Sequence, residues 1–197
     1  MPAILLALAL PCFARAAAIP PQEGLELARR GFSGMTDFTA DITQEKQIAL
    51  LRRAQTSTGQ VRFRRPDTFY MEVNPPFASR MLLKDNVLTM LLPAEGITQK
   101  TVLPPEEGLR HWFALLDRPV ARLPEGVDIR ADRRAGAITL RIIPATKKGV
   151  KELKVTLYED GRPRRLIIEE QNRDRTVINF LRVKKNVGLT EKDFRVE

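Results

Sequence analysis

The 197-residue chain contains one cysteine and one histidine, and these scarcities narrow the functions that it can have. Cys12 lies in an N-terminal apolar segment, so a chain cleaved behind that segment has no disulfide, thiol nucleophile or thiolate metal site. His111 alone is too little for a typical zinc site, and we interpret it as a surface residue. Glycine-rich phosphate loops and nucleotide-binding motifs are also missing. We therefore predict no catalytic residues, metal or other cofactor, and no enzymatic activity.

Long apolar runs are missing too. The N-terminal run, residues 4–10, is too short to anchor the chain stably across a bilayer. It leads into residues 14–18, whose small side chains resemble a signal-peptidase site. We predict a Sec-type signal peptide over residues 1–18, cleaved after Ala18, and one exported domain over residues 19–197. Leu10 and Pro11 precede Cys12 where lipidation needs small residues, so a lipid anchor is the less favoured alternative.

Acidic residues are fewer than basic ones, which gives a formal net charge of +9. Such a charge suits nucleic acid, anionic lipid or an acidic protein. Binding of single strands needs exposed aromatic residues among the basic ones, yet aromatic residues make up only 6% of the chain. Most of them, such as Phe63 between Arg62 and Arg64, occupy the apolar positions of an alternating pattern. We predict a solvated basic surface without a nucleic acid partner.

The alternating pattern is clearest over residues 59–73, where Val61 and Phe63 precede Pro66, and Phe69 and Met71 follow it. A period of two predicts strands of an antiparallel sheet with one apolar face, and Pro66 belongs at a corner. Similar segments along the chain predict about 10–11 strands. Two helices are predicted, near residues 22–34 and 106–117, and the second carries an apolar stripe. The predicted fold is mainly β, a large curved antiparallel sheet with helices on one face.

Two modest helices leave much of a wide apolar face uncovered, which suits either a permanent core or a pocket. Methionine is flexible and suits surfaces that repack, and Met35, Met71, Met81 and Met90 lie on the predicted strands or just before one. Methionine is also common in ordinary cores. From the residues alone, the core is the favoured interpretation.

The order of these features resembles the LolA-type periplasmic carriers of outer-membrane lipoproteins, over nearly the whole predicted mature chain. The resemblance is carried by a helix behind a signal peptide, a central helix and these motifs: Phe38-x-Ala40-x-Ile42-x-Gln44, Gly59-x-Val61-x-Phe63-x-Arg65-Pro66, Phe69-x-Met71, Asp85-Asn86, Ile143-Pro144, Asp160-Gly161 and Phe194. The chain departs from the family pattern at Met71, where carriers often have an aromatic residue, in the turn at residues 171–174, and behind Phe194, where a Pro-x-Gly tail is missing.

The resemblance implies an incomplete, strongly curved antiparallel β-barrel with a helical lid over an apolar cavity for acyl chains. The cavity wall would consist of Phe38, Ile42, Val61, Phe63, Phe69, Met71, Val73, Met81, Leu83, Leu88 and Met90. The lid would consist of Leu109, Trp112, Phe113 and Leu116. Arg65 would hydrogen-bond the lid and control its opening, whereas without the resemblance it would be an ordinary exposed arginine at a sheet edge.

The implied function is that of a monomeric periplasmic chaperone in a Gram-negative envelope. It would take acylated lipoprotein or lipid cargo from an inner-membrane export complex and pass it to an outer-membrane acceptor, with only transient contact with membrane surfaces. Three alternatives stay open: a carrier of free lipid or glycolipid with the same fold, a lipid-anchored acceptor, and an envelope sensor that binds a lipid or a protein.

Overall fold

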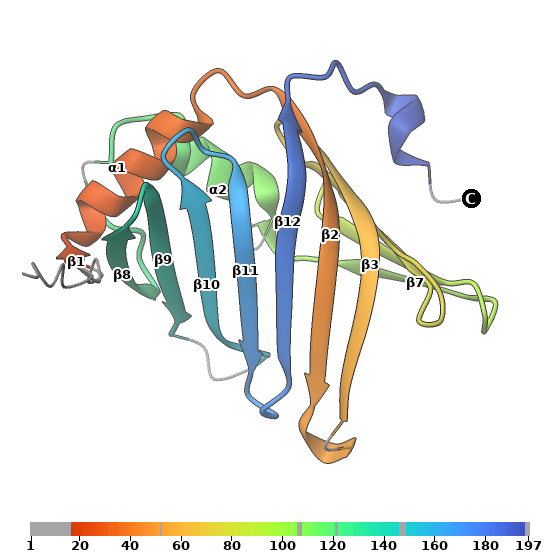
Figure 1. Ribbon diagram of the computed structural model, residues 1–197. Coiled ribbons are helices and arrows are strands. Elements are labelled where there is room, and N and C mark those ends of the chain that lie inside the picture. Colours follow the sequence, from red (N-terminus) through yellow and green to blue (C-terminus); the bar gives the residue numbers. More distant parts are fainter. Residues whose placement is uncertain (1–16, 52, 106–107, 121, 146–148, 196–197) are drawn as a thin grey trace, which may run out of the picture.

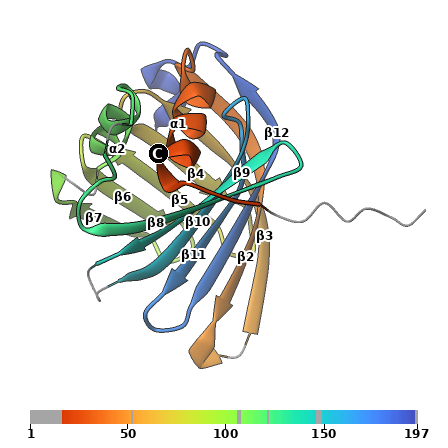
Figure 2. The same ribbon diagram turned by 90° about the vertical axis from the view of Figure 1, so that its left-hand side faces the viewer.

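A single antiparallel sheet of twelve strands curves around two helices (Figures 1 and 2). The computed structural model describes residues 17–51, 53–105, 108–120, 122–145 and 149–195, without the side chains of residues 51, 53, 112, 115 and 116. The sheet does not close, so the prediction of an incomplete curved barrel is confirmed, with twelve strands in place of ten or eleven. No helix of the described residues is long and apolar enough to cross a membrane.

The strands follow one another as hairpins in two runs. The first run is β2 (Asp37–Ile48), β3 (Arg53–Arg64), β4 (Thr68–Val73), β5 (Ser79–Lys84), β6 (Val87–Leu92) and β7 (Ile97–Val102). The second run is β8 (Val127–Arg134), β9 (Ala137–Pro144), β10 (Val150–Tyr158), β11 (Pro163–Glu170) and β12 (Arg175–Lys185). Pairing of β12 with β2 joins the two runs into one sheet, in which Phe180 lies opposite Ile42.

A short strand, β1 (Ala17–Ile19), pairs with β8 and forms one edge of the sheet. The predicted cleavage site behind Ala18 lies within this strand. Cys12 and the rest of residues 1–16 lie outside the described residues, so the signal peptide stays a prediction.

Apart from the strands, the described residues include two α-helices and two short 3-10 helices. Helix α1 (Pro21–Phe32) begins with proline at its first position, where the missing N–H costs nothing, and α2 (Leu109–Leu116) follows β7. The 3-10 helices are η1 (Ala49–Leu51), between β2 and β3, and η3 (Glu191–Phe194), near the C-terminus.

The core forms two clusters along the concave face. One lies between α1 and strands β8–β10, around Leu25, Ile138 and Leu140. The other lies over β2 and β3, around Met35 and Phe63, and is continued by residues of α2. Both clusters lie on the same face of the sheet because directly paired residues of an antiparallel sheet point to the same side.

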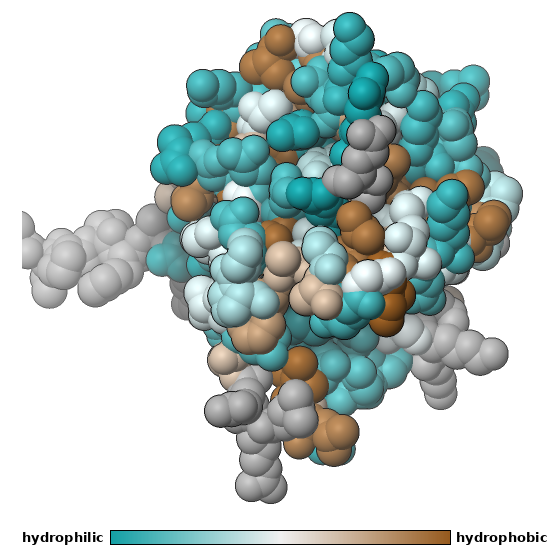
Figure 3. Space-filling model, turned by 90° about the vertical axis from the view of Figure 1, so that its right-hand side faces the viewer, coloured by the Kyte–Doolittle hydropathy of each residue, from teal (hydrophilic) through white to brown (hydrophobic). Residues whose placement is uncertain are grey.

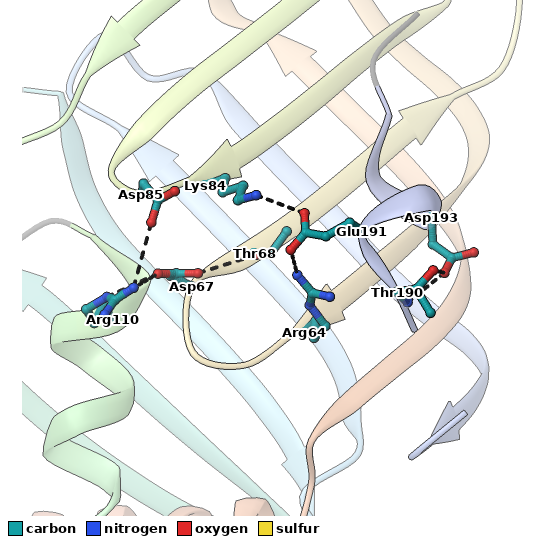
Figure 4. A network of polar contacts seen from close by, with 9 residues as sticks. All are labelled: Arg64, Asp67, Thr68, Lys84, Asp85, Arg110, Thr190, Glu191 and Asp193. Carbon is teal, nitrogen blue, oxygen red and sulfur yellow. Dashed lines mark hydrogen bonds and ion pairs between the residues drawn. The ribbon is translucent and has the colours of Figure 1, made fainter. Parts of the chain in front are cut away.

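The outer side of β3–β5 is covered by η3. Arg62 donates to the backbone oxygen of Asp193 at 2.7 Å, and Glu191 pairs with Arg64 and Lys84 (Figure 4). Phe194, the last residue of η3, is buried. Viewed from the side of β3, β7 and η3, the surface is mainly hydrophilic, with apolar residues in small separate groups (Figure 3).

Helix α1 packs very closely on β8, because Gly24 faces Ala131. A Cβ atom added at Gly24 would lie 2.3 Å from the Ala131 Cβ atom. In a helix, alanine is normally more favourable than glycine by about 1 kcal/mol. The sign of the change in the free energy of unfolding on replacing Gly24 by alanine therefore distinguishes close packing from an ordinary exposed helix position.

We expect Gly24→Ala to lower the free energy of unfolding by about 1–2 kcal/mol, because overpacking outweighs the gain in helix propensity. Chemical denaturation measures the change, and Gln22→Ala on the exposed side of α1 is the control, with an expected change within about 0.5 kcal/mol. A more stable Gly24→Ala protein would show that α1 does not lie against β8 as described.

Candidate functional site

A pocket of about 760 Å³ lies between α1, the segment behind α2, and the concave face of β9 and β10. Its volume is in the range of about 300–1,000 Å³ that is typical of ligand pockets. Its apolar lining comes from Leu25, Ala28 and Phe32 of α1, Leu140 and Ile142 of β9, and Val155 and Leu157 of β10. The same pocket is lined on the other side by residues of α2 and of residues 117–124.

These apolar residues lie on one face because of the strand register. Leu140 pairs with Val155 and Ile142 with Leu153, so the alternating residues of β9 and β10 point together toward α1. The pocket is thus a part of the concave face that the helices cover without filling.

The eleven residues predicted to form the cavity wall also share the concave face, but farther along the sheet. The pairs that place them there are Phe38 with Phe63, Val61 with Met71, Phe63 with Phe69, Met71 with Met81, Phe69 with Leu83, Met81 with Met90, and Leu83 with Leu88, while Ile42 and Val73 both pair with Gly59. None of the eleven lines the 760 Å³ pocket.

Burial divides these residues into two groups. Five of them are buried in the structure: Phe38, Ile42, Val61, Phe63 and Val73. The other six are half-buried: Phe69, Met71, Met81, Leu83, Leu88 and Met90. That acyl chains reach them stays a prediction.

Helix α2 covers the boundary between the pocket and the core over β2 and β3. The Phe113 ring stacks on Phe63 with a centroid distance of 4.7 Å and meets Phe32 of α1 edge-on at 5.8 Å. Leu109 packs on the same core. Trp112 and Leu116, also predicted for the lid, belong to α2, but their side chains lie outside what the structure describes.

The turn between β3 and β4 holds both ends of α2. Arg65 forms an ion pair with Asp117, directly behind the last residue of the helix, and its guanidinium carbon lies 5.2 Å from the centroid of Phe113. At the first turn of the helix, Arg110 donates to the buried Asp67 carboxylate, with 3.1 Å from Nε, and lies 3.7 Å from Asp85 (Figure 4). Charge-assisted contacts of this kind fix orientation more than they add stability.

The family resemblance pointed to Arg65, but neither it nor the sequence pattern pointed to Asp67 or Asp117. Acidic residues at a turn and behind a helix are too common to single out, and their arginine partners lie 43 and 52 residues away in the sequence. The pocket residues of β9 and β10 had a visible alternation, yet nothing in the sequence placed them under α1.

Glu26 of α1 connects the helix to the segment that borders the pocket. Hydrogen bonds from Arg29, supported by Arg30 and by the backbone N–H of Val120, lower the pKa of the Glu26 carboxyl from 4.5 to about 2. The carboxylate therefore keeps these contacts over the whole neutral and mildly acidic range.

Among the described residues, no three His, Cys, Asp or Glu side chains are grouped so that they could hold a metal ion. The contacts of the described residues likewise single out no catalytic group. His111 lies on the exposed side of α2 at the pocket, and the absence of a catalytic role stays a prediction.

Comparison with known proteins identifies relatives. The family model described as "Outer membrane lipoprotein carrier protein LolA" matches residues 33–197. An outer-membrane lipoprotein carrier protein of Pseudomonas fluorescens (strain Pf0-1) is 25% identical over 161 residues, which cover 81% of this chain and 77% of that protein.

Solved structures similar to this chain include a LolA superfamily protein from Nitrosomonas europaea, with a TM-score of 0.47 and 14% identity over 90% of this chain and 98% of that one. A putative outer membrane lipoprotein-sorting protein domain from Vibrio parahaemolyticus has a TM-score of 0.45 and 14% identity, over 89% and 97% of the two chains. Since these scores lie below 0.5, the assignment depends on the sequence matches.

If the ion pair of Arg65 with Asp117 holds α2 in place, its loss should increase the local opening of this helix. We expect Arg65→Leu to lower the free energy of unfolding by only about 0.5–1 kcal/mol, while amide hydrogen exchange in α2 becomes several-fold faster. Asp117→Leu should have the same effect, and the double variant no more than either alone. Arg130→Leu, which breaks an exposed pair with Asp128, is the control. Unchanged amide exchange in α2 would show that Arg65 does not hold the helix in place.

The lowered pKa of Glu26 implies that the contribution of this residue to folding stability depends on pH. Because the folded-state pKa lies below the unfolded one, the stabilisation by ionised Glu26 is fully present above about pH 4.5 and is lost as the pH falls toward 2. The difference in melting temperature between the parent protein and Glu26→Gln should shrink over that range. Glu23→Gln, on the first turn of α1, controls for the lost charge. A difference that is constant from pH 7 to 2 would contradict the assignment.

Proposed function

Since the chain belongs to the LolA family of outer membrane lipoprotein carrier proteins, we propose that it shields the acyl chains of lipidated cargo in the pocket under α1 and α2. The single observation that supports this site is an apolar pocket of about 760 Å³ on the concave face, bordered by a helix that the β3–β4 turn holds at both ends. The role is that of a chaperone without catalytic activity.

The energy of acyl burial sets the direction of transfer. Burial is worth about 0.8 kcal/mol per CH₂, so a chain of ~15 carbons gains roughly 12 kcal/mol in a membrane or an equivalent cavity. A carrier therefore needs a pocket that nearly matches the bilayer, and an acceptor that binds the cargo better. In this proposal an inner-membrane export complex supplies the cargo and the energy, and an outer-membrane acceptor receives it.

The position of α2 controls access in this mechanism. The helix is held by the Phe63–Phe113 stack and by ion pairs at its two ends. The pair of Arg65 with Asp117 is exposed enough to break at low cost, whereas the pair of Arg110 with the buried Asp67 is the firmer attachment. Movement of α2 away from the sheet would join the pocket over β9 and β10 to the half-buried residues of β4–β6. The space for long chains would then include the predicted wall residues Met71, Met81 and Met90.

By analogy with the family we propose transport in the periplasm, by a monomer that meets membrane surfaces only in passing. Carriage of lipoprotein is the first choice because both sequence matches are to lipoprotein carriers.

Filling the pocket tests the proposal. Ala114 is an exposed residue of α2 that lines the pocket, so Ala114→Trp should occupy the space without disturbing the core. We expect at least a tenfold weaker affinity for a fluorescent acyl probe and for a synthetic diacylated lipopeptide, which corresponds to about 1.4 kcal/mol.

The control is Ala145→Trp, an exposed residue behind β9 that does not line the pocket and should leave binding unchanged. Binding of neither acyl ligand to the parent protein, or equal binding to parent and Ala114→Trp, would refute the proposed site.

A further inference from the structure

The mouth of the pocket carries positive charge that nothing in the described chain neutralises. Arg118 and Arg122 line the pocket from the segment behind α2, and both are exposed. Within residues 17–51, 53–105, 108–120, 122–145 and 149–195, neither makes an ion pair or hydrogen bond. The one carboxylate of the lining, Asp117, already pairs with Arg65.

Many arginines elsewhere on the sheet have a carboxylate partner. On the outer face, Arg141 pairs with Glu152 and Arg175 with Glu169, and near the end of β8 Arg133 pairs with Glu159. The mouth of the pocket therefore differs from these parts of the surface, since two guanidinium groups stand beside an apolar lining without a partner.

This combination matches one kind of ligand. An apolar pocket takes an acyl chain, and the planar guanidinium group binds phosphate and carboxylate oxygens through paired N–H groups. Where a few polar groups surround an apolar pocket, they fix the orientation and the specificity of the ligand.

We propose that the pocket selects anionic amphiphiles, whose acyl chain lies between α1 and strands β9 and β10 while a phosphate or carboxylate of the head group binds Arg118 and Arg122. The inference rests on the proposed function and adds the charge of the head group to it. The anion can come from a phospholipid or from acidic residues next to the acylated end of a lipoprotein.

Two lysolipids with the same acyl chain test the charge preference. Lysophosphatidylglycerol has a net negative head group, whereas in lysophosphatidylcholine the choline cation offsets the phosphate charge. Displacement of a fluorescent acyl probe by each therefore compares net head-group charge at constant chain length. We expect the parent protein to bind the anionic lysolipid about tenfold more tightly at low salt, with the preference shrinking as salt screens the charges.

The variant Arg118→Gln/Arg122→Gln should lose this preference, mainly through weaker binding of lysophosphatidylglycerol, because only its phosphate charge is not offset within the head group. Arg134→Gln/Arg164→Gln is the matched control, because it removes the same charge from exposed arginines on the outer face that have no ion pair in the described chain. The control should keep the preference.

Each other outcome contradicts the inference in a recognisable way. Equal affinity of the parent protein for both lysolipids, with Ala114→Trp weakening both, overturns the selection of anions and leaves the proposed function intact. A preference that survives in the Arg118/Arg122 variant, or vanishes equally in the control, assigns it to overall charge and overturns the inference. Binding of neither lysolipid contradicts the proposed function itself.

A second pair of ligands identifies the source of the anion. Diacylated lipopeptides with Asp-Glu or Asn-Gln behind the acylated cysteine differ only in charge. Preference for the acidic lipopeptide that depends on Arg118 and Arg122 assigns the anion to the lipoprotein. Preference in the lysolipid pair alone assigns it to a phospholipid, and no preference in either pair overturns the inference.

Discussion

The concave face of the sheet offers more apolar surface than two short helices cover, and the position of α2 determines which part stays open. Paired apolar residues run from β8 to β12 and from β2 to β6, with Gln44 opposite Ile178 where β12 meets β2 and Gly59 opposite Ile42 where β2 meets β3. Helix α1 covers the β8–β9 side of this surface and α2 covers the middle. Burial of apolar area favours every contact that these helices make, so the pocket persists only where the helices cover the concave face without packing against it.

The β3–β4 hairpin is the structural element that positions α2. On its concave side, Phe63 stacks on Phe113, and the turn contributes Arg65 and Asp67 to the ends of the helix. On its outer side, Arg62 donates to the backbone oxygen of Asp193. Arg64 pairs with Glu191 on the same side (Figure 4). A hairpin fixed from both sides is a firm support for a helix whose own attachments are few and partly exposed.

The alternation of residues in single strands was enough to predict the sheet and its apolar face. It placed Phe63, Phe69 and Met71 on a common face, and the register confirms that face. The location of the pocket could not be predicted, because it depends on α1 lying over β9 and β10, which are over 100 residues away in the sequence. The contacts of Arg110 with Asp67 and of Arg65 with Asp117 join distant segments in the same way and leave no local pattern.

The account depends on acyl chains lying between α1 and strands β9 and β10. The most direct measurement is photo-crosslinking of a lipopeptide with a diazirine in its acyl chain, followed by peptide mapping. The account predicts labels on α1 near Leu25 and Phe32, and on Leu140 and Val155 of the sheet, with loss of labelling when unlabelled lipopeptide competes. Labels confined to the outer face of the sheet, or labelling without competition, would contradict it.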